Sequence, residues 1–195
     1  MSKKVLLLVG DYVEDYEAMV PLQVLLTVGH HVDVVSPDKK AGDTVKTAIH
    51  DFLPGEQTYV ELKGHNFSIT KDWTAVDGAH YDGLLIPGGR APEFLRQRDD
   101  VLKLVQHFCD TNKPLGAICH GPLVLTAIPG FLKGRKATAY PALKWDLLNA
   151  GAQWSDQCPI DGAVTDGHLV TGCAWPGHPA WLKAFIGLLG TKFQL

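Results

Sequence analysis

The sequence has few cysteines, no long apolar run and no marked excess of charge. No two cysteines form a Cys-x-x-Cys pair and the nine histidines are scattered, so we expect no metal site and no disulfide framework. No stretch approaches the roughly 18 apolar residues of a membrane-spanning segment. The net charge is −3 and the basic residues form no run, which argues against a nucleic-acid partner. The cysteines are Cys109, Cys119, Cys158 and Cys173.

The N-terminal segment lacks the features of a secretion signal. Its apolar run, Val5 to Val9, is too short for a signal-peptide core and is followed by acidic residues. We therefore expect reduced thiols and a cytoplasmic location. A length of 195 residues with 46% hydrophobic residues suits one globular domain, residues 1–195, with a core large enough to fold without disulfides.

Strand patterns alternate with helix patterns along the chain. Apolar or β-branched runs predict strands at residues 4–9, 31–36, 81–86, 114–118, 136–139 and 153–155. Helical spacing predicts helices at residues 15–28, 100–112, 120–128, 142–150 and 179–189. Residues 163–171 predict a hairpin on an Asp-Gly turn, and the polar stretch 40–75 is interpreted as inserted hairpins with strands near Val45, Tyr59 and Phe67. The alternation predicts an α/β fold with a mostly parallel sheet and helices on both faces.

In such a sheet the functional site lies at the carboxyl ends of the strands, and Cys119 is placed there. It follows a short apolar strand, precedes a predicted helix and lies between Gly116 and Gly121. Small residues at this junction permit the sharp turn of a nucleophile elbow, and a helix start stabilises a thiolate. The alternative is a buried structural cysteine.

Two further segments end at the same edge of the predicted sheet. Gly88 and Gly89 follow the strand at 81–86 and could offer backbone N–H groups to an oxyanion, although a plain turn is the alternative. Acidic residues begin the helix at 15–28, and spacing alone does not choose among them. These acidic residues are Glu14, Asp15 and Glu17. His120 is adjacent to the cysteine, but a structural histidine remains open there.

Taken together, the motifs resemble the ThiJ/PfpI superfamily. The resemblance is carried by residues 117–122 (Ala-Ile-Cys-His-Gly-Pro), 85–93 (Leu-Ile-Pro-Gly-Gly-Arg-Ala-Pro-Glu) and 14–17 with Pro21. Residues 50–52 (His-Asp-Phe) and 174–179 (Ala-Trp-Pro-Gly-His-Pro) are closer still to the plant glutathione-independent glyoxalases. The resemblance implies a flavodoxin-like three-layer sandwich. Because the plant proteins carry two such domains in tandem, it also implies that this chain forms a homodimer or larger homo-oligomer.

The resemblance also implies roles for particular residues. Cys119 matches the nucleophile, Glu17 the glutamate that holds it, and His120 the adjacent histidine. Gly88, Gly89 and the His120 amide match the groups that bind the oxyanion. Three further positions match residues near the pocket or the subunit contact of the superfamily: Glu93, Tyr140 and His178.

The hypothesis from the resemblance is conversion of the small dicarbonyls methylglyoxal or glyoxal to lactate or glycolate, without glutathione, metal or nicotinamide cofactor. The Cys119 thiolate would form a hemithioacetal, and a base would then move a proton through an enediol. We favour Glu17 as this proton shuttle, a role that His120 could share. The alternatives are a PfpI-like peptidase or amidase that uses Glu93 of a neighbouring copy, a protein deglycase, and a redox-sensing stress protein.

Overall fold

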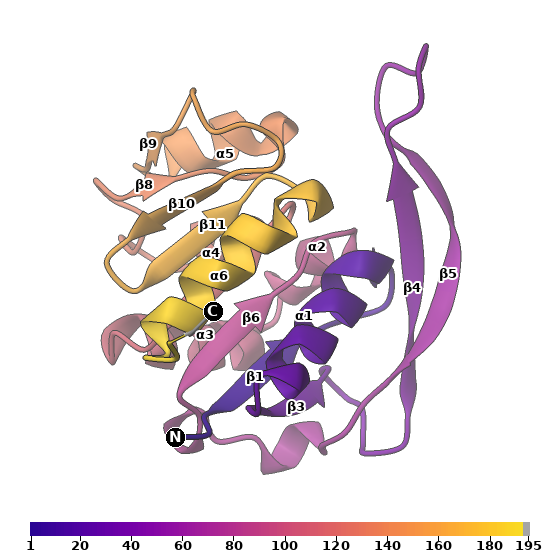
Figure 1. Cartoon of the computed structure of the whole chain (residues 1–195), viewed down its shortest axis with the longest axis vertical. Helices are drawn as coiled ribbons and strands as arrows, with labels where there is room; N and C mark the ends of the chain where they lie inside the picture. The colour runs from indigo at the N-terminus through magenta and orange to yellow at the C-terminus, as the bar shows by residue number, and fades with distance from the viewer. Residues whose placement is uncertain (193–195) are drawn as a thin grey trace.

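The structure is a computed structural model that describes residues 1–192, and its centre is a six-stranded sheet (Figure 1). In spatial order the strands are β10 (Ala163–Asp166), β11 (Leu169–Gly172), β7 (Leu115–Ile118), β6 (Gly83–Ile86), β1 (Lys4–Leu8) and β3 (His31–Val35). Five strands are parallel, and only the edge strand β10 is antiparallel to its neighbour β11. The continuous apolar runs of β1 and β6 are buried, as expected for strands covered on both faces.

Helices cover both faces of this sheet, which confirms the flavodoxin-like three-layer arrangement. In Figure 1 the helices α1 (Asp15–Thr27) and α6 (His178–Leu188) cross the front of the sheet, and α3 (Asp99–Asp110) lies behind it. Right-handed crossovers explain this, because α1 leads from β1 to β3 in one direction and α3 leads from β6 to β7 in the other. Three shorter helices complete the fold: α2 (Ala91–Leu95), α4 (Pro122–Thr126) and α5 (Lys144–Asn149).

The stretch predicted as inserted hairpins forms one long hairpin beside the sheet. Its strands are β4 (Thr44–Asp51) and β5 (Val60–Ser68), and β4 also pairs with the two-residue strand β2 (Val13–Glu14). Figure 1 shows this hairpin projecting past the sheet. Val45 and Phe67 are direct partners across it, whereas Tyr59 lies just before β5 instead of in a third strand.

Most other predicted elements are present with shifted ends. The predicted 163–171 hairpin is β10–β11, with Gly167 in the turn at a positive φ of 60°. The remaining strands, β8 (Lys136–Ala137) and β9 (Gln153–Trp154), pair in parallel. The helix predicted at 120–128 is shorter, because His120 and Gly121 belong to the turn before α4.

Four 3₁₀ turns connect these elements: η1 (Trp73–Ala75), η2 (Gly78–His80), η3 (Pro141–Leu143) and η4 (Trp175–Gly177). Among residues 1–192, no helix is both long and apolar enough to cross a membrane. Within the same range, no group of three or more histidine, cysteine, aspartate or glutamate side chains is arranged to hold a metal ion.

Candidate active site

Cys119 occupies a strained turn directly after β7. Its φ is +57°, a left-handed conformation that few side-chain-bearing residues adopt. The strain is held by hydrogen bonds on both sides, since its N–H donates to Gly172 O at 3.0 Å and its carbonyl accepts from the Tyr140 N–H at 3.0 Å. The glycine at 121 is needed because a Cβ there would collide with the Ile86 carbonyl. The predicted nucleophile elbow is therefore confirmed, and backbone strain of this kind is concentrated at functional sites.

The carboxyl group beside the thiol belongs to Glu17, in the first turns of α1. Glu17 is fully buried, and the nearby Cys119 thiol and Trp175 backbone N–H each act to lower the pKa of its carboxyl group. The Gly88 N–H donates to its Oε2 at 2.7 Å. These contacts hold the carboxyl group against the sulfur.

The two neighbouring acidic residues point elsewhere. Glu14 caps α1, because its Oε2 accepts the Glu17 N–H at 2.8 Å. Asp15 accepts hydrogen bonds from the Thr47 hydroxyl and the His65 backbone N–H. Only Glu17 therefore serves the thiol directly, a distinction that the spacing of the acids did not make.

The two glycines after β6 have different roles. The Gly88 N–H donates to Glu17 Oε2, so this amide is directed to the carboxyl group, and its role in binding an oxyanion stays a prediction. The backbone N–H groups of Gly89 and His120 lie near the Cys119 sulfur instead and act to lower the pKa of the thiol. Gly88 allows close approach, since a Cβ there would lie 2.6 Å from the Cys119 Cβ.

The thiol and carboxyl groups share a buried, coupled site. Burial raises the pKa of Cys119 well above its usual value, and the Glu17 charge adds to this, while the Gly89 and His120 amides lower it. Burial also raises the pKa of Glu17, with a further contribution from the charge of Glu14. Since two adjacent negative charges are disfavoured here, the pair retains a proton. With that proton on Glu17, the two amides stabilise a thiolate.

His120 packs beside the sulfur as a neutral ring. Its Nδ1 lies 3.3 Å from the Cys119 Sγ, and its ring stacks on Tyr140 with 5.2 Å between centroids. Burial lowers the His120 pKa to about 4, so the ring is uncharged at neutral pH. It can therefore hydrogen-bond to the thiol, but it does not supply a cation that would stabilise a thiolate.

A narrow pocket opens onto Cys119. It holds about 270 Å³ of atom-free space, part of which is open to solvent, so it is a small pocket. Its lining is mostly aromatic and imidazole side chains with few polar groups: Glu14, His50, Phe52, Tyr59, Gly89, Cys119, His120, Tyr140, Ala174 and Trp175. Tyr140 thus lies where it was expected. The sequence does not predict that residues of the β4–β5 hairpin line this pocket, although residues 50–52 and 174–179 belong to the motifs that carry the family resemblance.

Known proteins resemble this chain in sequence and in fold. A family model described as the DJ-1/PfpI family matches residues 3–188. The chain belongs to the DJ-1/PfpI family. It is 51% identical to Protein DJ-1 homolog D of Arabidopsis thaliana over 98% of this chain and 49% of the relative. It is 32% identical to a deglycase of Pyrococcus horikoshii over 95% of this chain and 99% of the relative.

Length separates these DJ-1/PfpI relatives into two groups. The chain spans about half of the Arabidopsis relatives it matches but nearly all of the archaeal and Escherichia coli ones, the last being protein/nucleic acid deglycase 2 at 34% identity. Among solved structures, Drosophila melanogaster DJ-1beta superposes with a TM-score of 0.74 at 24% identity, covering 98% of this chain and 92% of that one. That likeness supports the fold.

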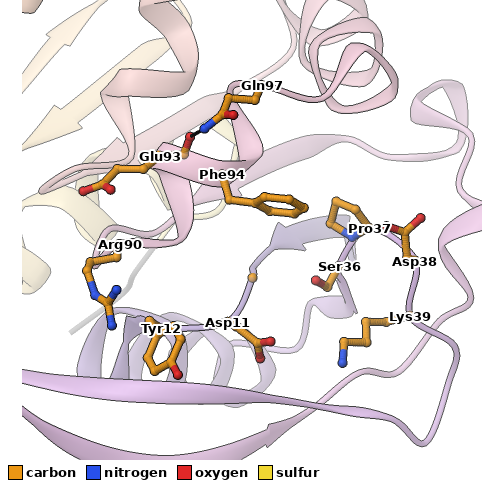
Figure 2. Close-up of a pocket in the computed structure, with 11 residues that line it drawn as sticks. Asp11, Tyr12, Ser36, Pro37, Asp38, Lys39, Arg90, Glu93, Phe94 and Gln97 are labelled. Carbon is orange, nitrogen blue, oxygen red and sulfur yellow. Dashed lines mark hydrogen bonds between the residues drawn. The ribbon is translucent and has the colours of Figure 1, made fainter.

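Two residues assigned by resemblance lie outside the Cys119 pocket of this family member. Glu93 is exposed on α2 and lines a wider neighbouring cleft of about 1030 Å³ with Arg90 and Phe94 (Figure 2). His178 begins α6 and packs near Trp181. The η4 turn places Trp175 in the pocket lining, whereas His178, which follows this turn, lies outside it. Within one copy of the chain, neither residue joins the thiol site.

Proposed function

We propose that this chain is a cysteine-dependent enzyme that converts methylglyoxal or glyoxal to lactate or glycolate. The observation that carries the proposal is the buried Cys119–Glu17 pair beside a narrow, largely aromatic pocket. A narrow pocket favours a small substrate such as a two- or three-carbon dicarbonyl, and a carbonyl carbon is a suitable target for a thiolate.

The reaction begins with addition of the thiol to the aldehyde. Glu17 takes the thiol proton, the Cys119 sulfur bonds to the aldehyde carbon, and the resulting oxyanion accepts hydrogen bonds from the Gly89 and His120 amides. Transfer of the proton on that carbon to the adjacent carbonyl carbon, through an enediol, gives a thioester. Water then cleaves the thioester, which releases the hydroxy acid and restores the thiol. The net change is addition of one water molecule.

The test is release of lactate from methylglyoxal without glutathione. Wild type should produce lactate, and Cys119→Ala should produce almost none. The matched control is Cys158→Ala, because Cys158 is half-buried and lies outside the pocket. Absence of lactate from the wild-type protein would refute the proposal.

A second candidate, removal of dicarbonyl adducts from arginine or lysine side chains, is favoured by the relatives named deglycases. The same thiolate would attack the same carbon. The assay is loss of a methylglyoxal adduct from an acetylated arginine, with and without an aminoguanidine scavenger. If the adduct is lost no faster than it releases free methylglyoxal without enzyme, the chain has only the first activity. Loss of the adduct faster than this uncatalysed rate would indicate a deglycase.

The peptidase and redox-sensor alternatives predict different behaviour. A peptidase requires Glu93 of another copy to reach His120, so Glu93→Gln should abolish the peptidase activity. A sensor would not consume methylglyoxal catalytically. The lactate assay therefore separates both from the proposed reaction.

We also propose that the chain pairs with a second copy, since its Arabidopsis relatives are twice its length. An apolar groove between α1 and α6, lined in part by Val20, Val24 and Leu182, is a suitable contact. Sedimentation velocity should show a dimer that Val24→Lys dissociates, while Leu62→Lys on the exposed hairpin leaves it intact. A monomeric wild-type protein would refute the pairing.

A further inference from the structure

His50 is a buried imidazole in the Cys119 pocket that the mechanism above does not use. It lies on β4, its side chain is 7% exposed, and it lines the pocket together with Cys119 and His120. Its Nδ1 is buried and has no hydrogen-bond partner among the described residues. An unpartnered buried acceptor costs on the order of 1–3 kcal/mol, so its retention beside a nucleophile calls for an explanation.

The other nitrogen of this ring is held by a carboxylate. His50 Nε2 lies 3.0 Å from Glu61 Oε2, and Glu61 in turn accepts two hydrogen bonds from Arg90, at 2.8 and 2.9 Å. The Arg90 hydrogen bonds hold the pKa of Glu61 below its usual value, so Glu61 stays ionised. An ionised carboxylate accepts the proton of Nε2–H, and the imidazole lone pair is therefore on Nδ1.

The ring is also fixed in orientation. The Trp175 Nε1–H donates to the His50 carbonyl at 3.1 Å, and the His50 ring contacts Tyr59 edge-on with 5.1 Å between centroids. Both of these aromatic residues line the same pocket. A base held by a carboxylate on one nitrogen, with the other nitrogen free, is the arrangement that general-base catalysis uses.

We propose that His50, oriented by Glu61 and Arg90, is the group that moves the carbon-bound proton of the substrate. This inference rests on the proposed dicarbonyl reaction and adds a residue to it. His50 Nδ1 removes the proton from the carbon bonded to sulfur, the electron pair forms the enediol, and the resulting imidazolium returns the proton to the adjacent carbon. No oxidant or second substrate is required, because the step is an isomerisation.

Two other candidates for this step, Glu17 and His120, are less well placed. Glu17 is fully buried, interacts with the thiol, and is absent from the pocket lining, so it reaches the sulfur and not the substrate carbon. His120 lines the pocket, but within residues 1–192 no carboxylate hydrogen-bonds to its ring, and its Nδ1 is directed to the Cys119 sulfur. Glu17 therefore handles the thiol proton, and His50 handles the carbon proton.

The test compares His50→Gln with a matched control, His31→Gln. His31 also pairs with a carboxylate, Asp33 at 3.2 Å, but its side chain is exposed on β3. In the lactate assay, His50→Gln should lower kcat by about 100-fold or more, the range for loss of a general base, with KM changed only a few-fold. His31→Gln should match wild type. Glu61→Gln should lower kcat as well, because an amide has only one oxygen for the donors of His50 and Arg90.

Two further measurements separate a chemical role from a structural one. Added imidazole should restore part of the activity of His50→Ala, since it can occupy the space that the side chain leaves. The rate of Cys119 alkylation by iodoacetamide should be the same in His50→Gln as in wild type.

The results of these measurements distinguish a failure of the proposed reaction from a failure of the proposed role of His50. A wild-type protein that makes no lactate overturns both the reaction and the role of His50. A wild-type protein that makes lactate, together with an equally active His50→Gln variant, overturns only the role of His50. That role is also overturned if imidazole restores nothing to His50→Ala, or if Cys119 alkylation changes in His50→Gln, since the side chain would then act only by supporting the pocket.

Discussion

Replacing Gly88 by alanine should disturb the thiol site through a single methyl group. The Gly88 φ is not in the left-handed region, so alanine can adopt the same backbone conformation and the effect is steric. The new Cβ would lie 2.6 Å from both the Cys119 Cβ and the Glu17 Oε2, and 2.8 Å from the His120 N. All three distances are too short for non-bonded atoms, so the elbow or the carboxyl group must move.

The expected cost follows from this overlap. Overpacking a buried site by one methyl group costs about 1–3 kcal/mol. For a chain of this length, a loss of about 2 kcal/mol lowers Tm by roughly 4–8 °C. A displacement of the nucleophile by about 1 Å lowers kcat by up to about 100-fold, so activity should fall more steeply than stability.

The matched control is Gly187→Ala on α6, where a new Cβ would meet no atom within 4 Å. Alanine is the better helix former, so this variant should be more stable by roughly 0.5 kcal/mol and fully active. Thermal unfolding and lactate release, measured on both variants, provide the check. A Gly88→Ala protein with the Tm and kcat of wild type would show that the contact between β6, α1 and the elbow is looser than described.

Three further predictions concern stability. Trp181→Ala should cost about 3–5 kcal/mol in urea unfolding, because the ring is fully buried and its Nε1–H bonds to Val170 O at 3.2 Å; a smaller loss would mean that the core closes over the gap. Thr47→Val should cost about 1–3 kcal/mol, since it removes a hydroxyl donor from the buried Asp15 carboxylate; unchanged urea midpoints would contradict this. Burial lowers the His178 pKa from 6.5 to about 4, so the unfolded chain binds a proton there before the folded one does. Stability should therefore fall as pH drops from about 6.5 to 4, by up to roughly 3 kcal/mol, and His178→Gln should flatten this part of the profile of unfolding free energy against pH.

The strands and the elbow could be predicted because their signals are local. β1 and β6 are short apolar runs between polar segments, and Cys119 lies between small residues at a strand end. A strand buried on both faces and a sharp turn each produce a recognisable pattern within a few consecutive residues. The same is true of Gly167, where an Asp-Gly pair predicted the β10–β11 turn.

The choice among the acids of α1 depended on information outside the segment. Glu14, Asp15 and Glu17 are close in sequence, yet they serve the helix cap, the hairpin and the thiol respectively. Their directions depend on how α1 is rotated against β6 and β7. Only the motif resemblance singled out Glu17, and its contacts with Gly88 and the thiol agree with that choice.

The walls of the pocket could not be predicted from local pattern. β5 is largely exposed and shows no clean alternation of buried and exposed residues, so its pairing with β4 was not evident. His50 and Tyr59 reach a cysteine that is at least sixty residues away in sequence only because this hairpin folds over the elbow. The link from His50 through Glu61 to Arg90 was also concealed, because its members lie 11 and 29 residues apart in sequence.

The position of the β4–β5 hairpin has a consequence for how this protein could diversify. Cys119 and Glu17 are rooted in the central sheet and α1, where most substitutions would cost stability. His50, Phe52 and Tyr59, in contrast, come from a peripheral hairpin whose outer surface is exposed to solvent. Substitutions in that hairpin can reshape the substrate cavity while the nucleophile keeps its geometry. In the proposed reaction, selectivity among carbonyl compounds can therefore change through a short stretch of sequence without rebuilding the reactive centre.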